Sequence, residues 1–213
     1  MIQNSPEWYE ARRRKFTSSE IWKLMGATKG INTETAQTYI MEVFLEHKGI
    51  SKELISTKEM EWGQLYEPLA FKKFSEKVAP LQKAGFEQYN DFWGGSADGI
   101  GDGFVWEVKC PYNSAIHMKY LASIQDAKTL YAEKKEYYWQ IQSNMLINKL
   151  DYGIFCTFYP RLPLRLALHY AEIQANKDDF DKMETNVFAA QKQVTQMLEK
   201  VLNPIQRYSI PKN

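Results

Sequence analysis

The stretch that decides the fold is SADGIGDGFVWEVKCP, which covers residues 96–111. Its Asp102-Gly103 pair favours a two-residue β-hairpin turn. A turn at this pair would place Asp98 directly opposite Glu107 on the two strands. The stretch therefore predicts a hairpin that carries one acidic residue on each arm.

The second arm of this hairpin alternates between polar and apolar residues. Successive side chains of a strand point to opposite faces of a sheet, so Glu107 and Lys109 share one face while Trp106 and Val108 share the other. Asp98 joins Glu107 on the polar face if the turn forms as expected. The pattern predicts that two acids and a lysine meet at the rim of a sheet.

Two opposed carboxylates are suited to holding a hard metal ion. Directly opposite residues have Cβ atoms about 4.5–5.5 Å apart, and Mg²⁺ takes oxygen ligands at about 2.0–2.1 Å. Such an ion lowers the pKa of a bound water and neutralises charge on a phosphoryl oxygen. Lys109 could position that water or stabilise that charge. The residues predict phosphodiester hydrolysis by metal-activated water.

The alternative interpretation of this stretch is an exposed polar sheet face. The Glu-x-Lys spacing alone carries little information, because Glu46–Lys48 and Glu133–Lys135 share it and are interpreted as surface charge on helices. At Glu107 the same spacing is more informative, because it lies in a strand pattern and follows the acidic residue Asp98 on the other arm of the hairpin.

Two further polar residues are candidates for the same site. Glu67, in the segment WGQLYEP, falls on a helix before the sheet and could supply a third oxygen ligand; an exposed helical glutamate is the alternative. Gln140, in YYWQIQSNM, falls on a later helix. Gln142 is about 200° further around that helix, so only one of the two glutamines can face a given point.

Composition bounds the protein class. The chain has 213 residues, 44% of them hydrophobic, and a net charge of +1, which predicts one folded domain over 1–213 and only a local nucleic-acid surface. It has two cysteines, a charged start without an apolar signal core, and no run of about 18 apolar residues. We therefore expect a cytoplasmic protein that does not span a membrane.

The element pattern predicts a mixed α/β fold around one central sheet. A Thr17–Glu20 capping box would open a short helix, and Thr33 or Thr35 a second one. Pro68 should kink or restart a third helix. We expect helices over about 17–26, 33–47, 57–74, 126–149 and 176–202, and strands within 81–109 and over 151–159 and 164–173.

Other constellations give no site. His47, His117 and His169 show no zinc spacing with either cysteine. The glycines of 94–103 lack the Gly-Lys-Ser or Gly-Lys-Thr of a phosphate loop. Cys110 is interpreted as a small buried residue that fills space.

The motifs WGQLYEP, SADG, EVKCP and YYWQIQ follow one another in the order and spacing of a known family. The chain resembles the lambda-exonuclease-like phage nucleases, the YqaJ viral recombinase family of the PD-(D/E)XK superfamily. The opening WYEARRRKFTSSE and the later DYGIFCTFYPR fit the same family, so the resemblance runs from about residue 8 to 161. It implies a restriction-endonuclease-like fold, a central mixed sheet flanked by helices.

The resemblance also implies residue roles, carried over by position. Asp98, Glu107 and the main-chain carbonyl of Val108 would be magnesium ligands, with manganese as the alternative ion, and Glu67 would complete or support the metal shell. Lys109 would be the catalytic lysine, and Gln140 would help to hold the site or its attacking water. The residues that match the family's 5′-phosphate-binding positions are Arg12, Ser19 and Ser96.

Such enzymes degrade one strand of duplex DNA from 5′ to 3′, often as ring-shaped trimers, and work with a phage single-strand annealing protein. The alternatives are an endonuclease or RecB-like repair nuclease on the same fold, and a non-catalytic subunit that binds DNA ends. The chain departs from the family at Ala115, where a basic residue can stand, with His117 nearby. Arg13 or Arg14 could replace Arg12 in the phosphate contact.

Overall fold

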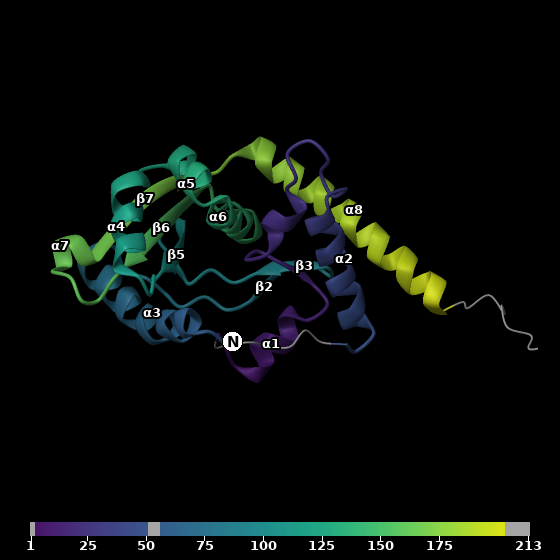
Figure 1. The fold of residues 1–213 in the computed structure, drawn as a ribbon, viewed down its shortest axis with the longest axis horizontal. Helices are drawn as coiled ribbons and strands as arrows, with labels where there is room; N and C mark the ends of the chain where they lie inside the picture. The colour runs from purple at the N-terminus through teal and green to yellow at the C-terminus, as the bar shows by residue number, and fades with distance from the viewer. Residues whose placement is uncertain (1–2, 51–55, 203–213) are drawn as a thin grey trace, which may run out of the picture.

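The structure is a computed structural model that describes residues 3–50 and 56–202, with helices and strands mixed along the chain (Figure 1). The described strands form two sheets, in the orders β1-β3-β2 and β4-β5-β6-β7. The elements are, in chain order, α1 (Pro6–Arg12), β1 (Phe16–Thr17), η1 (Ile21–Leu24), α2 (Glu34–His47), α3 (Lys58–Lys77), β2 (Glu87–Asn90), β3 (Trp93–Gly95), β4 (Gly99–Gly101), β5 (Phe104–Lys109), α4 (Ser114–Ser123), α5 (Ala127–Glu133), α6 (Lys135–Asn148), β6 (Tyr152–Phe158), α7 (Leu164–Ala167), β7 (Leu168–Gln174) and α8 (Lys177–Leu202).

The expected hairpin is present as β4 and β5. Gly101 pairs with Phe104, so the turn lies at the predicted dipeptide, and Gly103 has a φ of 80° that a residue without Cβ adopts at no steric cost. Continued by one residue beyond the Gly99–Trp106 pair, this register sets Asp98 opposite Glu107. The predicted register is therefore confirmed.

The hairpin belongs to a four-stranded sheet of mixed direction. β5 pairs with β6 in parallel, while β4 with β5 and β6 with β7 are antiparallel. Parallel neighbours need a long crossover connection, and here α4, α5 and α6 supply it between β5 and β6. The crossover brings α6 onto the sheet face that carries Val105 of β5.

The two faces of this sheet pack against different helices (Figure 1). On one face, Ala70 and Phe74 of α3 pack on Trp106 and Val108 of β5, and the rings of Phe74 and Trp106 lie 5.4 Å apart. On the other face α6 approaches closely, because a Cβ at Gly153 of β6 would lie 2.7 Å from Ile141 of α6. The apolar face predicted for Trp106 and Val108 is thus confirmed.

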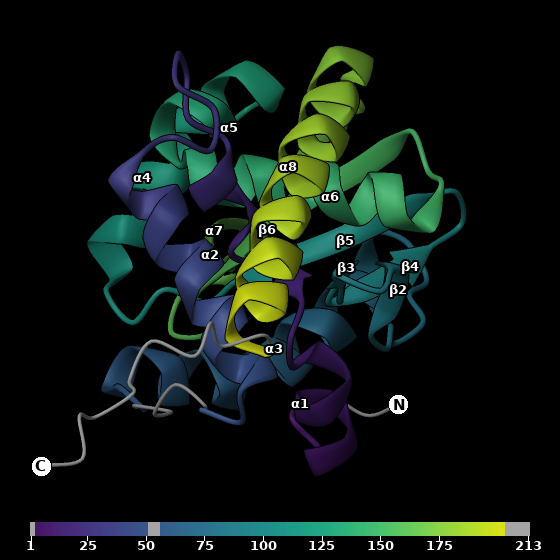
Figure 2. The same ribbon diagram turned by 90° about the vertical axis from the view of Figure 1, so that its right-hand side faces the viewer.

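A second sheet of three strands lies beside this core, which corrects the expectation of one central sheet. β1 pairs in parallel with β3, and β3 pairs with β2. The two residues of β1 extend a sheet whose other strands, β2 and β3, come from the segment before the hairpin. Figure 2 shows the long helix α8 lying across α2, which it contacts, at this end of the molecule.

Three predicted elements differ from the structure. Thr17 is no helix cap: it lies in β1, its N–H donates to the Tyr39 hydroxyl at 2.8 Å, and only a 3₁₀ turn follows. Pro68 neither breaks nor restarts α3, since it sits on the exposed side, where water can reach the carbonyl that lacks a donor. The segment 164–173 opens with the helical turn α7 after Pro163 and becomes a strand only from Leu168.

The other long elements match their predicted ranges, except that the helix expected over 126–149 is divided at Lys134 into α5 and α6. Thr33, not Thr35, caps α2, Thr57 caps α3, and Asp126 caps α5. The C-terminal helix α8 covers the expected segment, while residues 203–213 of the expected domain lie outside the described residues. None of the described helices is both long and apolar enough to cross a membrane.

Candidate active site at the hairpin rim

Asp98 and Glu107 meet at the rim of the four-stranded sheet. Asp98 lies just before β4, and its Oδ2 accepts a hydrogen bond from the Val108 N–H at 2.8 Å. Glu107 on β5 is only 1% exposed, more buried than a residue on an open sheet face. Burial and the charge of Glu107 raise the pKa of Asp98 to about 8, and burial also raises the pKa of Glu107.

Lys109 is bound between this acid pair and α6. Its Nζ donates to Glu107 Oε1 at 2.8 Å and to Gln140 Oε1 at 3.1 Å, and it lies 4.8 Å from the centre of the Tyr137 ring. Burial lowers the pKa of Lys109, but the charges of Glu107 and Asp98 outweigh this and leave it above its usual value. The lysine is therefore a fixed cation at the site.

The two glutamines of α6 face different parts of the molecule. Gln140 reaches Lys109, whereas Gln142 is fully buried elsewhere. The Gln142 amide donates to the Gln174 carbonyl at 2.8 Å and accepts from the Asn176 N–H at 3.0 Å. The helix geometry thus separates them as expected, and Gln142 fixes the connection between β7 and α8.

One polar residue of α6 was missed by the sequence interpretation. Asn144 lies one turn after Gln140, is 1% exposed, and donates to Glu107 Oε2 at 3.3 Å. The i, i+4 spacing from Gln140 is the signal that could have revealed it, because residues four apart share a helix face.

Glu67 of α3 approaches the acid pair from the other side. Burial raises its pKa, the charge of Asp98 adds to this, and Lys83 opposes it through an ion pair at 3.4 Å. Leu69 on the same helix is 37% exposed, and the apolar face of α3 that packs on the sheet is formed by Ala70, Phe71 and Phe74.

A cleft of about 710 Å³ opens beside Lys109. Its walls combine acids, cations and rings, and the lining residues are Glu59, Met60, Gly63, Glu67, Val108, Lys109, Cys110, Pro111, Tyr112, Asn113, Ile116, Tyr120, Lys134 and Tyr137. Met60, Tyr112 and Ile116 are exposed apolar side chains on this wall. Partial burial raises the pKa of the Cys110 thiol to about 12, so it stays protonated; Cys110 is half-buried on this wall and not the fully buried residue that was expected.

The acid pair fits a hard cation by the chemistry of its donors. Burial is the main cause of the raised pKa of both carboxyl groups, and the charge of Glu107 adds to it at Asp98; a divalent ion would offset this cost of ionising the pair. No three acidic, histidine or cysteine side chains within residues 3–50 and 56–202 form a ready-made ligand group. Mg²⁺ is commonly bound through one or two carboxylates and keeps several waters, so two acids suffice.

The predicted phosphate-binding residues lie together in a second cluster. The Arg12 guanidinium donates to Ser19 Oγ at 3.2 Å and lies 4.1 Å above the Trp8 ring, and the Trp8 indole N–H donates to Ser96 Oγ at 2.8 Å. Trp8 was missed as a member of this cluster. Ser96 is two residues before Asp98, so the cluster adjoins the acid pair.

Other basic and imidazole groups near the site have different roles. Arg13 and Arg14 pair with Glu10 on the exposed side of α1, at 3.0 and 2.8 Å. His117 is fully buried: its Nδ1 lies 3.0 Å from Thr157 Oγ1 and its Nε2 2.7 Å from the Leu166 carbonyl. It holds α4 on the sheet and does not replace the basic residue absent at Ala115.

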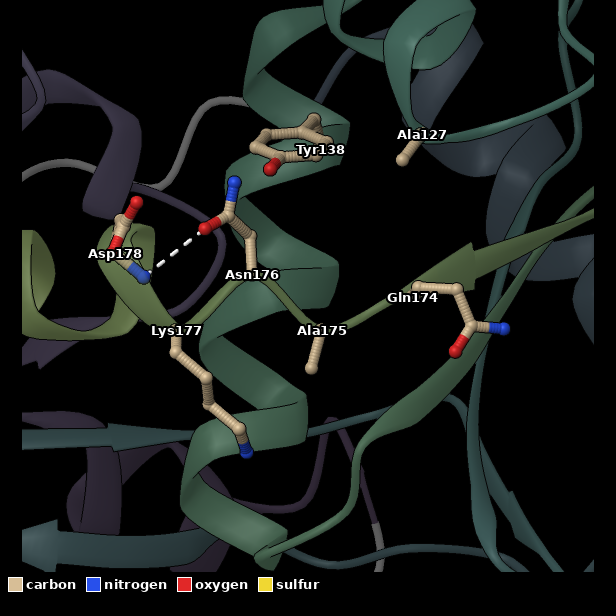
Figure 3. Close-up of a pocket in the computed structure, with 7 residues that line it drawn as sticks. All are labelled: Ala127, Tyr138, Gln174, Ala175, Asn176, Lys177 and Asp178. Atoms are coloured by element: carbon tan, nitrogen blue, oxygen red, sulfur yellow. Dashed lines mark hydrogen bonds between the residues drawn. The ribbon is translucent and has the colours of Figure 1, made fainter.

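Another hollow, of about 440 Å³, lies at the junction of β7 and α8 (Figure 3). Figure 3 shows Asn176 receiving a hydrogen bond from the Asp178 N–H, with Lys177 pointing away from Tyr138. It shares no lining residue with the cleft at Lys109. The acid pair, the lysine and the arginine cluster therefore make the rim of β5 the candidate active site.

Comparison with protein families agrees with this site. A family model described as YqaJ-like viral recombinase domain matches residues 7–151. The chain belongs to this family. The match includes both clusters, from Arg12 to Asn144, and confirms the resemblance seen in the motifs. No curated protein matches the chain in sequence.

Solved structures share the fold of this YqaJ-like chain. An alkaline exonuclease from Laribacter hongkongensis has a TM-score of 0.81 and 23% identity over 93% of this chain and 96% of its own. The same enzyme in complex with dAMP gives 0.79 and 24%, over 92% and 96%. A phage-related exonuclease from Haemophilus somnus 129PT gives 0.72 and 18%, over 88% and 96%. These likenesses confirm the restriction-endonuclease-like fold class.

Proposed function

We propose that this chain is a magnesium-dependent deoxyribonuclease that degrades one strand of duplex DNA from a 5′-phosphorylated end, in the 5′ to 3′ direction. The observation that carries the proposal is the position of Ser96 and Asp98 in one short segment. Ser96 contacts the Trp8–Arg12 cluster, and Asp98 faces Glu107. An anion bound at Arg12 and a cation bound at Asp98 would be near neighbours.

The residues of this site would share the work as follows. Asp98, Glu107 and the Val108 carbonyl would hold the ion, with Glu67 completing or supporting its shell, and manganese could replace magnesium. A bound divalent ion supplies an activated water and neutralises charge on the attacked phosphate. Lys109 adds a fixed positive charge beside that phosphate, and Gln140 keeps the lysine in place.

Binding of the DNA would use both the cluster and the cleft. A planar guanidinium can bind two oxygens of a phosphate at once, and the Ser19 and Ser96 hydroxyls add further donors beside Arg12. The apolar side chains of Met60 and Tyr112 offer a surface for a base next to the reacting phosphate. A terminal phosphate fixed at Arg12 would direct cleavage to the strand whose 5′ end carries that phosphate.

The experiment compares linear duplexes with a 5′-phosphate or a 5′-hydroxyl, and nicked circular duplex, in magnesium, manganese or calcium. We expect digestion of the phosphorylated linear DNA to mononucleotides, slower digestion of the hydroxyl form, and binding without turnover in calcium. Cleavage of nicked circles would favour the endonuclease or RecB-like alternative. Binding of ends without any cleavage would favour the non-catalytic subunit.

The partners of the proposed enzyme follow from the family resemblance. They are duplex DNA ends, two further copies of the chain in a trimer, and a phage single-strand annealing protein in the cytoplasm of a bacterial host. The mass of the protein in solution, measured by light scattering with and without DNA ends, tests the trimer. A monomer under both conditions would contradict it.

A further inference from the structure

We propose that Asn144 is a positioning residue that holds the Glu107 carboxylate and the Ser96–Asp98 segment in one arrangement. This inference rests on the proposed function, since it concerns the geometry of the same site. Asn144 lies on α6 and is 1% exposed. It is not among the residues proposed above to bind the metal ion, the DNA or Lys109.

The contacts of Asn144 join two parts of the chain. Its Nδ2 donates to Glu107 Oε2 at 3.3 Å and to the Ser96 carbonyl at 3.4 Å. Glu107 belongs to β5, whereas Ser96 belongs to the segment between β3 and β4 that carries Asp98. One amide nitrogen therefore binds both chain segments that supply the acid pair.

The orientation of this amide is fixed by its partners. The Ser96 carbonyl can only accept a hydrogen bond, so the NH₂ group must face it and the amide oxygen must point away. Asn144 Oδ1 is buried and has no hydrogen-bond partner in the part of the chain that the structure describes. Buried polar atoms are rarely left unpaired, so the unpaired oxygen destabilises the fold. The two hydrogen bonds donated by the same amide offset this destabilisation.

The backbone around Asn144 leaves space for this arrangement. A Cβ at Gly95 would lie 2.5 Å from Asn144 Oδ1 and 2.0 Å from Ser18 Oγ. Only a glycine at this position of β3 lets α6 approach so closely. The close approach places the amide within reach of Ser96, the next residue along the chain.

Together with Gln140, Asn144 makes α6 the support of Glu107. Oε1 of Glu107 is bound by Lys109, which Gln140 holds, and Oε2 is bound by Asn144. Both amides come from one face of a single helix, four residues apart. The carboxylate thus has each oxygen tied to the same rigid element, which limits its rotation.

The test compares Asn144→Leu and Asn144→Asp, which both keep the size of the side chain and remove the NH₂ donor. Gln142→Leu is the matched control, because Gln142 is a buried, doubly hydrogen-bonded amide on the same helix that touches neither Glu107 nor Ser96. We would measure kcat and KM on 5′-phosphorylated linear duplex, and calcium binding without DNA by calorimetry.

We expect Asn144→Leu to weaken calcium binding and lower kcat by about 10- to 100-fold, the range typical when a group supporting a metal ligand is lost. Asn144→Asp should lower kcat to a similar degree while KM for DNA stays near the wild-type value. Gln142→Leu should lower Tm but leave kcat and calcium affinity unchanged below its Tm. If Asn144→Leu fails to fold, Asn144→Asp still gives the kcat comparison.

The inference is wrong if both Asn144 variants keep the wild-type kcat and KM, or if Gln142→Leu loses as much kcat and calcium affinity as Asn144→Leu. Failure of the proposed function has a different signature, because the wild-type protein itself would then show no metal-dependent cleavage. The two outcomes are read from different proteins in the same assay.

Discussion

Asp98 and Glu107 share a buried space, and their raised pKa values express the cost of ionising both. The sequence placed them opposite each other correctly, but it gave no sign that Glu107 is almost fully buried. That burial depends on α6, which packs over β5 only after a long crossover. For this reason truncation to alanine would leave a cavity here, and isosteric variants test the site better.

We predict that Asp98→Asn stabilises the metal-free protein while it abolishes cleavage. The amide carries no charge to repel Glu107, and its oxygen can still accept from the Val108 N–H. Since one pKa unit corresponds to about 1.4 kcal/mol, the free energy of unfolding at pH 8 should rise by about 1 kcal/mol or more. Urea unfolding in EDTA and digestion of linear DNA in magnesium measure the two effects.

Asp102→Asn is the matched control for this variant. Asp102 lies at the exposed tip of the same hairpin, and Asn-Gly also suits the turn. It should change neither cleavage nor stability by much. An Asp98→Asn protein that digests DNA at the wild-type rate would overturn the assignment of the acid pair.

Gln140→Ala should lower kcat by about tenfold or more, because Lys109 loses one of its two hydrogen-bond acceptors, and bonds to charged groups contribute about 1.5–3 kcal/mol. Gln142→Ala should instead lower stability by about 1–3 kcal/mol, through its two buried hydrogen bonds. Single-turnover rates and thermal unfolding separate these results. Equal losses of rate would contradict the helix geometry.

Arg12→Ala should erase the preference for 5′-phosphorylated over 5′-hydroxyl ends. Arg12→Lys should not restore it, because an ammonium cannot bind two phosphate oxygens in the planar fork of a guanidinium. Arg13→Ala is the matched control, since Arg13 pairs with Glu10 on the exposed side of α1. The measurement is the ratio of digestion rates on 5′-phosphorylated and 5′-hydroxyl duplexes of the same sequence. If this ratio is unchanged in Arg12→Ala, another residue binds the terminal phosphate.

At the scale of elements, local sequence signals predicted turns and helix ends correctly wherever the backbone hydrogen-bonding groups find partners among residues close in sequence. The Asp-Gly turn, the Thr33 and Thr57 caps and the spacing of α8 all depend on neighbours in sequence. The failures have tertiary causes. Thr17 is held extended by its pairing with Gly94, a residue far along the chain, which a capping signal cannot reveal.

The candidate site follows the same division. Asp98, Glu107 and Lys109 could be placed from strand alternation alone, and the family resemblance added Gln140 and the residues around Arg12. Asn144 was missed because its role depends on the approach of α6 to Gly95 of β3, which no local pattern encodes.

His117 connects α4 to the sheet and to α7, and this position should make the fold sensitive to acid. Burial lowers its pKa below the usual value of about 6.5. As pH falls below about 6.5 the unfolded chain binds a proton that the folded chain resists, so stability is present above this pH and is lost below it. We predict that the free energy of unfolding falls between pH 7 and 5.5, and that His117→Gln flattens this slope.

Urea unfolding at several pH values measures the effect. His47 also has a pKa lowered by burial, but its contribution is common to both proteins and cancels in the comparison. His169→Gln is the control, because it replaces another histidine whose Nε2 contacts a main-chain carbonyl, that of Ile124. A slope that His117→Gln leaves unchanged would remove this residue as the cause.

At the scale of the whole molecule, the net charge of +1 limits how DNA can be held. Several cations near the cleft are already paired with acids, among them Lys83 with Glu67 and Lys134 with Glu136. The affinity for DNA must therefore come from a few local contacts between cations and phosphates. If the proposed trimer forms, each copy of the chain contributes its own set of these contacts.

We predict that duplex binding in calcium weakens with salt at a log-log slope set by these few contacts. Each neutralised phosphate contributes about 0.9 to that slope on duplex DNA, so Arg12→Ala should reduce it by about one. Lys177→Gln, beside the distant hollow at α8, should leave it unchanged. Titrations at several salt concentrations measure the slope. A slope that both variants share with the wild-type protein would mean that the DNA lies on another face, because release of counterions counts only the phosphates that the protein contacts.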